Sequence, residues 1–189
     1  CFCVGAEALP EGHTCQESLW QSVDSNPVSI TEDGYYYLDW MDSKASSIRV
    51  ADGVNAYVCL NGAKIYAQQT VQLGIKSSLT ICDCSLGGKG TITISAAAKG
   101  APVFLNGQKT ITLMSGIISG TISNATFPAV TISSSHSNFY MYGGEISGNT
   151  ATRVEYLKAG ATTTSSAGGY AGGVAVYGVL NIYGGKISN

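Results

Sequence analysis

The stretch "FYMYGGEISG" (residues 139–148) is nearly repeated 41 positions later as "LNIYGGKISN" (residues 180–189), and this repetition decides the fold. A third copy, "ITLMSGIISG", occupies residues 111–120. Each copy follows a short apolar segment, and these segments begin at Val103, Val130 and Val174, so their spacing is 27 and then 44 residues. A repeat in the range of about 20–50 residues, built only from strand-like segments, is typical of a solenoid.

The alternation of apolar residues predicts which side chains point into the solenoid, because residues i and i+2 of a strand share a face. Three columns of inward residues result. The first column contains Leu79/Ile81, Ile111/Leu113, Phe139/Met141 and Leu180/Ile182. The second contains Val71/Leu73, Val103/Leu105, Val130/Ile132 and Val174/Val176. The third contains Ile118, Ile146 and Ile187. Three columns predict three faces around a narrow interior, which is an all-β parallel β-helix; we expect it to be right-handed, as the family resemblance described below implies. The glycine pairs at 143–144 and 184–185 are predicted corners, where a positive φ is needed.

Charge and cysteine are distributed unevenly along the 189 residues. Residues 1–84 carry 4 basic and 10 acidic side chains, whereas residues 85–189 carry 6 basic and 2 acidic ones. All six cysteines lie at or before position 84. We therefore expect residues 1–49 to form a Cys-rich N-terminal capping segment, with "DGYYYLDW" (33–40) as an aromatic strand of that cap. Residues 50–189 are expected to form the coils, which we expect to continue in a longer parent chain.

The cysteines predict export, because an even number concentrated in one region is typical of a disulfide framework. They are Cys1, Cys3, Cys15, Cys59, Cys82 and Cys84, and six cysteines leave about 15 pairings open. A zinc site that includes His13 is an alternative, but structural zinc sites use C-x₂₋₄-C spacing rather than the C-x-C found here. A lipidated Cys1 is a further alternative. We assign no metal ligands and no cofactor.

Catalysis is not expected in the coils, because acid–base chemistry on glycans needs paired carboxylates. Residues 85–189 contain no Asp, and their only acidic residues are Glu145 and Glu155. Glu145 aligns with Lys186 of the next repeat, which predicts an ion pair between coils. Neither His13 nor His136 has a triad partner nearby in the sequence. The competing hypothesis is a carbohydrate-active β-helix enzyme whose acidic site lies outside residues 85–189, and a third is a purely structural stalk.

Composition also bears on partners. No Lys/Arg cluster interleaved with aromatics indicates a nucleic-acid partner, and no apolar run is long enough to predict membrane insertion. Outward-facing tyrosines are the predicted binding residues, since exposed aromatics stack on sugars or anchor proteins. They are Tyr140, Tyr142, Tyr183, Tyr177 and Tyr170. The plainer interpretation is that tyrosine is a favoured strand residue whose hydroxyl tolerates water.

Several segments together resemble a known family: "CFC…GHTC", "YYYL", "VCLNGAKI", "SLTICDC", "GTITIS" and the "GGxISGN" units. They are similar to secreted right-handed β-helix repeat proteins of anaerobic Gram-positive gut bacteria. The resemblance implies an extracellular location, at the cell surface or secreted, and a role in adhesion or display with a host glycan or mucosal protein as partner. One departure is an insertion at residues 150–173, in which "RVEYLK" (153–158) is expected to form a helical turn. The insertion is either a binding loop or a tolerated addition.

Overall fold

The computed structural model describes residues 20–40, 43–67, 69–85, 87, 90–95, 100–120, 128–148, 154–157, 164–167 and 173–188. Within these ranges every regular element is a β-strand. Sheet A contains β1 (Trp20–Val23), β3 (Gly34–Leu38), β6 (Asn55–Cys59), β9 (Ser77–Cys82), β12 (Lys109–Leu113), β15 (Asn138–Met141) and β20 (Val179–Ile182). Sheet B contains β2 (Val28–Ile30), β5 (Ile48–Val50), β8 (Val71–Leu73), β11 (Val103–Leu105), β14 (Val130–Ile132) and β19 (Val174–Val176). Sheet C contains β4 (Ser43–Ala45), β7 (Lys64–Ala67), β10 (Thr91–Ile94), β13 (Ile117–Ser119), β16 (Glu145–Ser147) and β21 (Lys186–Ile187).

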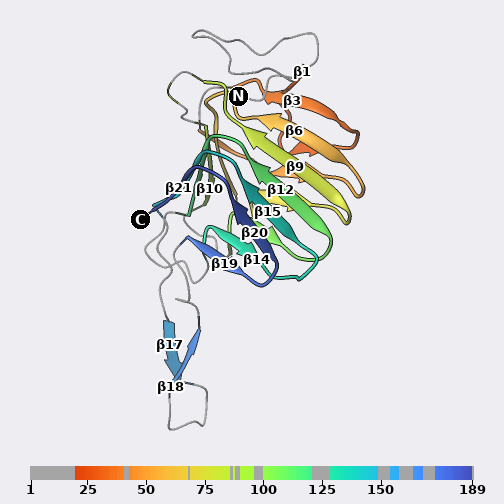
Figure 1. Ribbon diagram of the computed structural model, residues 1–189. Coiled ribbons are helices and arrows are strands. Elements are labelled where there is room, and N and C mark those ends of the chain that lie inside the picture. Colours follow the sequence, from red (N-terminus) through yellow and green to blue (C-terminus); the bar gives the residue numbers. More distant parts are fainter. Residues whose placement is uncertain are drawn as a thin grey trace.

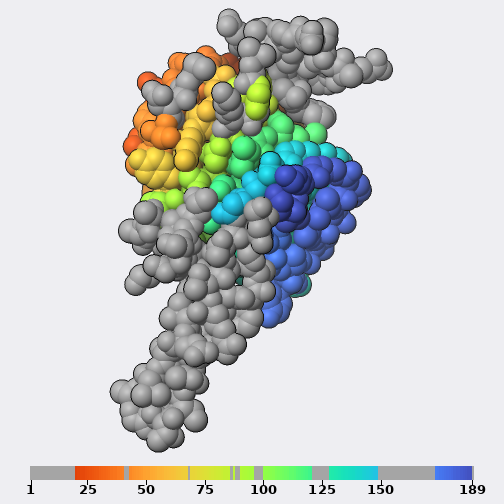
Figure 2. Space-filling view, turned by 90° about the vertical axis from the view of Figure 1, so that its left-hand side faces the viewer, coloured from red at the N-terminus to blue at the C-terminus, as the bar shows by residue number. Residues whose placement is uncertain are grey.

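The chain visits the three sheets in turn, and this path makes the molecule a parallel β-helix. From β3 onward the coil strands follow the order A, C, B, and each pairs in parallel with its counterpart one coil away. Figure 1 shows the sheet A strands stacked from β1 to β20. In Figure 2 the successive coils form bands that run from orange near the N-terminus to blue at the C-terminus. The predicted fold class is therefore confirmed.

The inward columns occupy the predicted register, but their members in the last coil, Val176, Ile182 and Ile187, are exposed rather than buried. Ile111 pairs with Leu79 on one side and with Phe139 on the other, and all three are completely buried. The columns of sheets B and C stack in the same way, with Val103 against Val130 and Ile118 against Ile146. Burying one such side chain stabilises the fold by about 1.5–3 kcal/mol. Because each coil supplies apolar residues to its neighbours, the core is continuous along the solenoid.

Both glycines of the 143–144 pair have a structural reason. Gly144 has a φ of +77°, a backbone conformation that glycine adopts without a Cβ clash. Gly143 allows a close approach instead, since a Cβ there would run into the carbonyl oxygen of Met114 in the preceding coil. Gly144 therefore allows the chain to turn at this corner, and Gly143 allows the corner to pack closely on the preceding coil.

The coils begin earlier than predicted. Strands β1 to β5 fall within residues 1–49, yet they belong to the same three sheets as the later strands. The segment 33–40 supplies β3, which pairs with β1 and β6 inside sheet A. The boundary expected at residue 50 is therefore too late, and the coils reach Trp20. Any cap formed by residues 1–19 lies outside the described residues.

Differences in coil length are concentrated in the connection from sheet C to sheet B. These connections comprise residues 46–47, 68–70, 95–102, 120–129 and 148–173, so they lengthen steadily toward the C-terminus. The last one contains the antiparallel hairpin of β17 (Val154–Leu157) and β18 (Thr164–Ala167). Figure 1 shows this hairpin extending away from the coils. The helical turn expected over 153–158 is wrong, because antiparallel pairing satisfies the backbone of this segment as a strand.

Candidate functional site

The outer face of sheet A carries two columns of side chains, set by the same register that aligns the core. The first column contains Trp20, Tyr35, Tyr57, Thr80, Thr112, Tyr140 and Asn181. The second contains Tyr37, Cys59 and Cys82, and backbone hydrogen bonds from the next coils extend it through Met114, Tyr142 and Tyr183. Aromatic and sulfur-containing residues therefore dominate this face.

Tyr142 and Tyr183 form an exposed aromatic pair at the C-terminal end of the second column. Their ring centroids are 4.7 Å apart and their planes differ by 17°, so the rings are stacked. Half of the Tyr142 side chain and 64% of Tyr183 are exposed. Stacking of this kind contributes about 0.5–1.5 kcal/mol beyond area burial. The pair exists because a 41-residue coil brings two "YGG" corners into adjacent positions.

The other predicted tyrosines do not extend this pair into one strip. Tyr140 is half-buried in the neighbouring column, beside Asn181. Tyr177 is 85% exposed but precedes β20, whereas Tyr183 follows that strand. A strand of four residues spans about 13 Å, so these two side chains lie beyond opposite ends of strand β20. Tyr170 lies outside the described residues.

A second aromatic stack lies at the N-terminal end of the first column and was not predicted. The rings of Tyr35 and Tyr57 are stacked with centroids 4.6 Å apart, and Trp20 contacts Tyr35 at 5.4 Å in a tilted arrangement. Trp20 is buried, with 5% of its surface exposed. The signal that identifies this stack is the repeated aromatic phase of β1, β3 and β6, but the first coil advances by only 15 residues (Trp20 to Tyr35). That spacing falls outside the repeat range that reveals the later coils.

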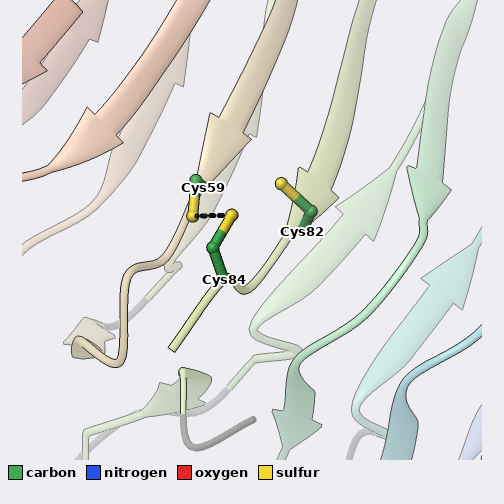
Figure 3. Close-up of side chains that lie close together, drawn as sticks. All are labelled: Cys59, Cys82 and Cys84. Atoms are coloured by element: carbon green, nitrogen blue, oxygen red, sulfur yellow. Dashed lines mark hydrogen bonds between the residues drawn. The ribbon is translucent and has the colours of Figure 1, made fainter. Parts of the chain in front are cut away.

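Three cysteine side chains lie close together where β6 and β9 end (Figure 3). Cys59 ends β6 and is the register partner of Cys82, which ends β9. The Sγ atom of Cys59 lies 2.8 Å from that of Cys84, and all three Sγ atoms lie within 4.8 Å of one another. Cys59 and Cys82 are buried, while Cys84 is partly buried. Cys84 is also disulfide-bonded, and its partner is neither of the other two. Cys1, Cys3 and Cys15 lie outside the described residues.

Asp83 holds the two cysteines that flank it. Its buried carboxylate accepts hydrogen bonds from the backbone N–H of Gly62 at 2.8 Å and of Gly90 at 2.7 Å. The Ser85 hydroxyl donates to the same carboxylate, and the Asp83 N–H donates to Ser115 Oγ. Asp83 directly follows β9, and its carboxylate is buried while the Sγ atoms of Cys82 and Cys84 both approach Cys59. The C-x-C spacing thus directs two sulfurs to one face.

Glu145 and Lys186 form the predicted ion pair. The two residues are register partners in sheet C, and Lys186 Nζ lies 3.7 Å from Glu145 Oε1. A hydrogen bond from Ser147 is the main influence that lowers the pKa of Glu145, and the charge of Lys186 acts in the same direction. Both side chains remain in contact with water, so the pair is an ordinary surface interaction.

Three described acidic side chains outside this pair, those of Asp33, Asp52 and Asp83, accept hydrogen bonds from backbone N–H groups. Asp33 accepts from Asn55 N–H, which is the main cause of its lowered pKa, and Asp52 accepts from Ile75 N–H. His136 is exposed, with its Nδ1 atom 3.3 Å from the hydroxyl of Ser135. His13 lies outside the described residues. Over the described ranges, the cysteine trio is the one group of three or more Cys, His, Asp or Glu side chains arranged closely enough to share a metal ion.

The described part of the chain contains no helix with the length and apolar character needed to span a membrane. No family model matches the chain, and neither a curated protein nor a solved structure matches it at a significant level.

Proposed function

We propose that the protein is a non-catalytic binding module, exported to the bacterial cell surface or secreted, that binds a neutral glycan. The observation that carries this proposal is the exposed, stacked pair of Tyr142 and Tyr183. Tyr combines a large apolar ring with a polar hydroxyl, and it is enriched among residues that anchor ligands and partners. The family resemblance of the repeats supports the extracellular location.

The surroundings of the pair favour a sugar over a charged ligand. The neighbouring column presents Thr112, Tyr140 and Asn181, which offer uncharged donors and acceptors for sugar hydroxyls. Around the corner, Lys186 and Glu145 offset each other's charge. An apolar platform beside neutral polar groups complements a sugar ring, which has an apolar face and a hydroxyl rim.

The distribution of carboxylates supports the non-catalytic part of the proposal. Asp33, Asp52 and Asp83 each accept backbone hydrogen bonds at turns of the solenoid. Side chains committed to backbone donors in this way are structural rather than arranged as an acid–base pair.

The test is a binding screen of the 189-residue chain against mucin-type and plant glycans, with immobilised mucosal proteins in parallel. We expect glycan binding by the wild type and its loss in the Tyr142→Ala/Tyr183→Ala double variant. Tyr177→Ala is the matched control, because Tyr177 is even more exposed than Tyr183 but lies beyond the other end of strand β20. Binding that survives in the double variant, or that goes only to the mucosal proteins, would contradict the proposal.

A further inference from the structure

We propose that Cys59, Cys82 and Cys84 form a site for one thiophilic metal ion, Zn²⁺ or Cu⁺, on the outer face of sheet A. This site is separate from the tyrosine pair, and the proposal does not depend on glycan binding. Its basis is the convergence of three sulfur atoms from two neighbouring coils (Figure 3).

The sulfur positions fit a shared ion. Three thiolates about 2.3 Å from one ion lie about 4 Å from one another. The three Sγ atoms of the cluster are all within 4.8 Å of one another. Cys59 Sγ and Cys84 Sγ are closer, at 2.8 Å, so they would separate by about 1 Å on binding.

The ligands are held by rigid elements. Cys59 and Cys82 end paired strands, so the sheet fixes their backbones relative to each other. The carboxylate of Asp83 anchors the segment between Cys82 and Cys84 to Gly62 and Gly90. Metal ligands placed on strands and supported by hydrogen bonds lose little entropy when an ion binds.

The donor set selects the class of ion. The described residues that form this group are all cysteines, without a carboxylate or an imidazole. Partly buried Tyr37, Tyr57 and Met114 pack against the buried group that contains Trp20, Cys59 and Cys82. Soft thiolates favour Zn²⁺ or Cu⁺, whereas Mg²⁺ and Ca²⁺ prefer oxygen ligands.

Reduction controls access to the site, because Cys84 is disulfide-bonded. A phosphine reductant cleaves that S–S bond, supplies two electrons and is itself converted to the phosphine oxide with oxygen from water. Both sulfurs leave as thiols. Each cysteine that then binds the ion releases one proton, so binding strengthens as the pH rises.

The experiment uses the 189-residue chain, reduced with a phosphine and then desalted without oxygen. Titration with Cd²⁺ follows the thiolate-to-metal absorption band, and Zn²⁺ and Cu⁺ are then tested by competition. We expect one ion per reduced chain and none per unreduced chain. Cys59→Ser/Cys82→Ser/Cys84→Ser should lose the band, while Met114→Leu, which changes a packing neighbour, should bind as the wild type does.

Two controls keep the result interpretable. Circular dichroism establishes whether each variant is folded, and if the triple variant is not, the single Cys82→Ser variant decides, since Cys82 is not the partner of Cys84. Absence of the band in the reduced wild type overturns the proposal, as does full binding by a folded Cys82→Ser or triple variant. Binding by the unreduced chain overturns the requirement for reduction. Direct titration of the reduced chain with Zn²⁺ and with Cu⁺, followed by the protons that each ion releases, establishes which of the two binds. Binding of neither ion overturns the assignment of the site to them.

Discussion

The inner and outer faces of sheet A share one register but differ in the residues that they repeat. On the inner face, Ile111 is stacked between Leu79 and Phe139, and every coil contributes an apolar side chain. On the outer face, Thr112 is stacked between Thr80 and Tyr140, and the same columns also contain Trp, Cys, Met and Asn. Burial restricts the first face to apolar residues, whereas the second is free to vary. Binding chemistry is therefore expected on the outer face.

The largest expected effect separates the two faces directly. Leu113→Asp places a charge among completely buried side chains and should abolish folding, since a buried unpaired charge costs far more than a typical net stability of about 5–15 kcal/mol allows. Thr112→Asp, one residue away on the outer face, should change the free energy of unfolding by only about 0.5–1 kcal/mol. Urea unfolding followed by circular dichroism measures both. Equal tolerance of the two changes would mean that the faces are assigned the wrong way round.

A smaller effect is expected at Asp83, a carboxylate that is already buried in the folded protein. Asp83→Ala leaves the N–H groups of Gly62 and Gly90 without their acceptor, and each buried unsatisfied donor costs about 1–3 kcal/mol. We expect a loss of about 2–5 kcal/mol in the free energy of unfolding. Asp52→Ala, which removes an exposed carboxylate that also accepts a backbone N–H, should cost about 1 kcal/mol or less. Similar losses for both would show that burial of Asp83 adds nothing.

The smallest effect concerns an outer position of sheet C, where the charge stays in water. The pKa of Glu145 is lowered in the folded protein, so its contribution to stability is present above its unfolded pKa near 4.5 and is lost as the pH falls through the folded value. Ser147→Ala and Lys186→Met should each raise this pKa, because each change removes an influence that lowers it. An NMR titration of the Glu145 carboxyl carbon measures both shifts. An unchanged titration in either variant would show that the side chain removed there does not act on Glu145.

The later coils could be predicted from sequence because their inward residues recur together with a glycine corner. Ile118, Ile146 and Ile187 stand at the same offset from "GG" or "SG", so their alignment needs no structure. The earliest coils lack this marker. Val28 and Ile30 of β2 are an isolated apolar pair, and β4 is a short polar strand recognised by its backbone pairing with β7. A periodic signal that short cannot be separated from an ordinary loop.

The candidate site was predictable in part. The "YGG" repeat predicts that Tyr142 lies beside Tyr183. The C-x-C spacing argues against a zinc site in the sequence, yet Cys82 and Cys84 both approach Cys59 in the structure. The approach of Cys59 depends on the register of Val58 with Ile81, which the faint similarity of the early repeats did not specify. Long-range register of this kind is set by the packing of whole coils rather than by local residue preference.

The lengthening connections between sheets C and B have a consequence for how such a protein can change over time. The strands on either side keep their register whether the connection comprises residues 46–47 or residues 148–173. A doubling of loop length costs only about 0.6 kcal/mol in closure entropy, so this edge can lengthen without disturbing the stack. Mutation can therefore add residues along one margin of the solenoid, whereas the connections at the other two corners stay between two and eight residues long. The same margin is the natural place to graft a foreign peptide for display.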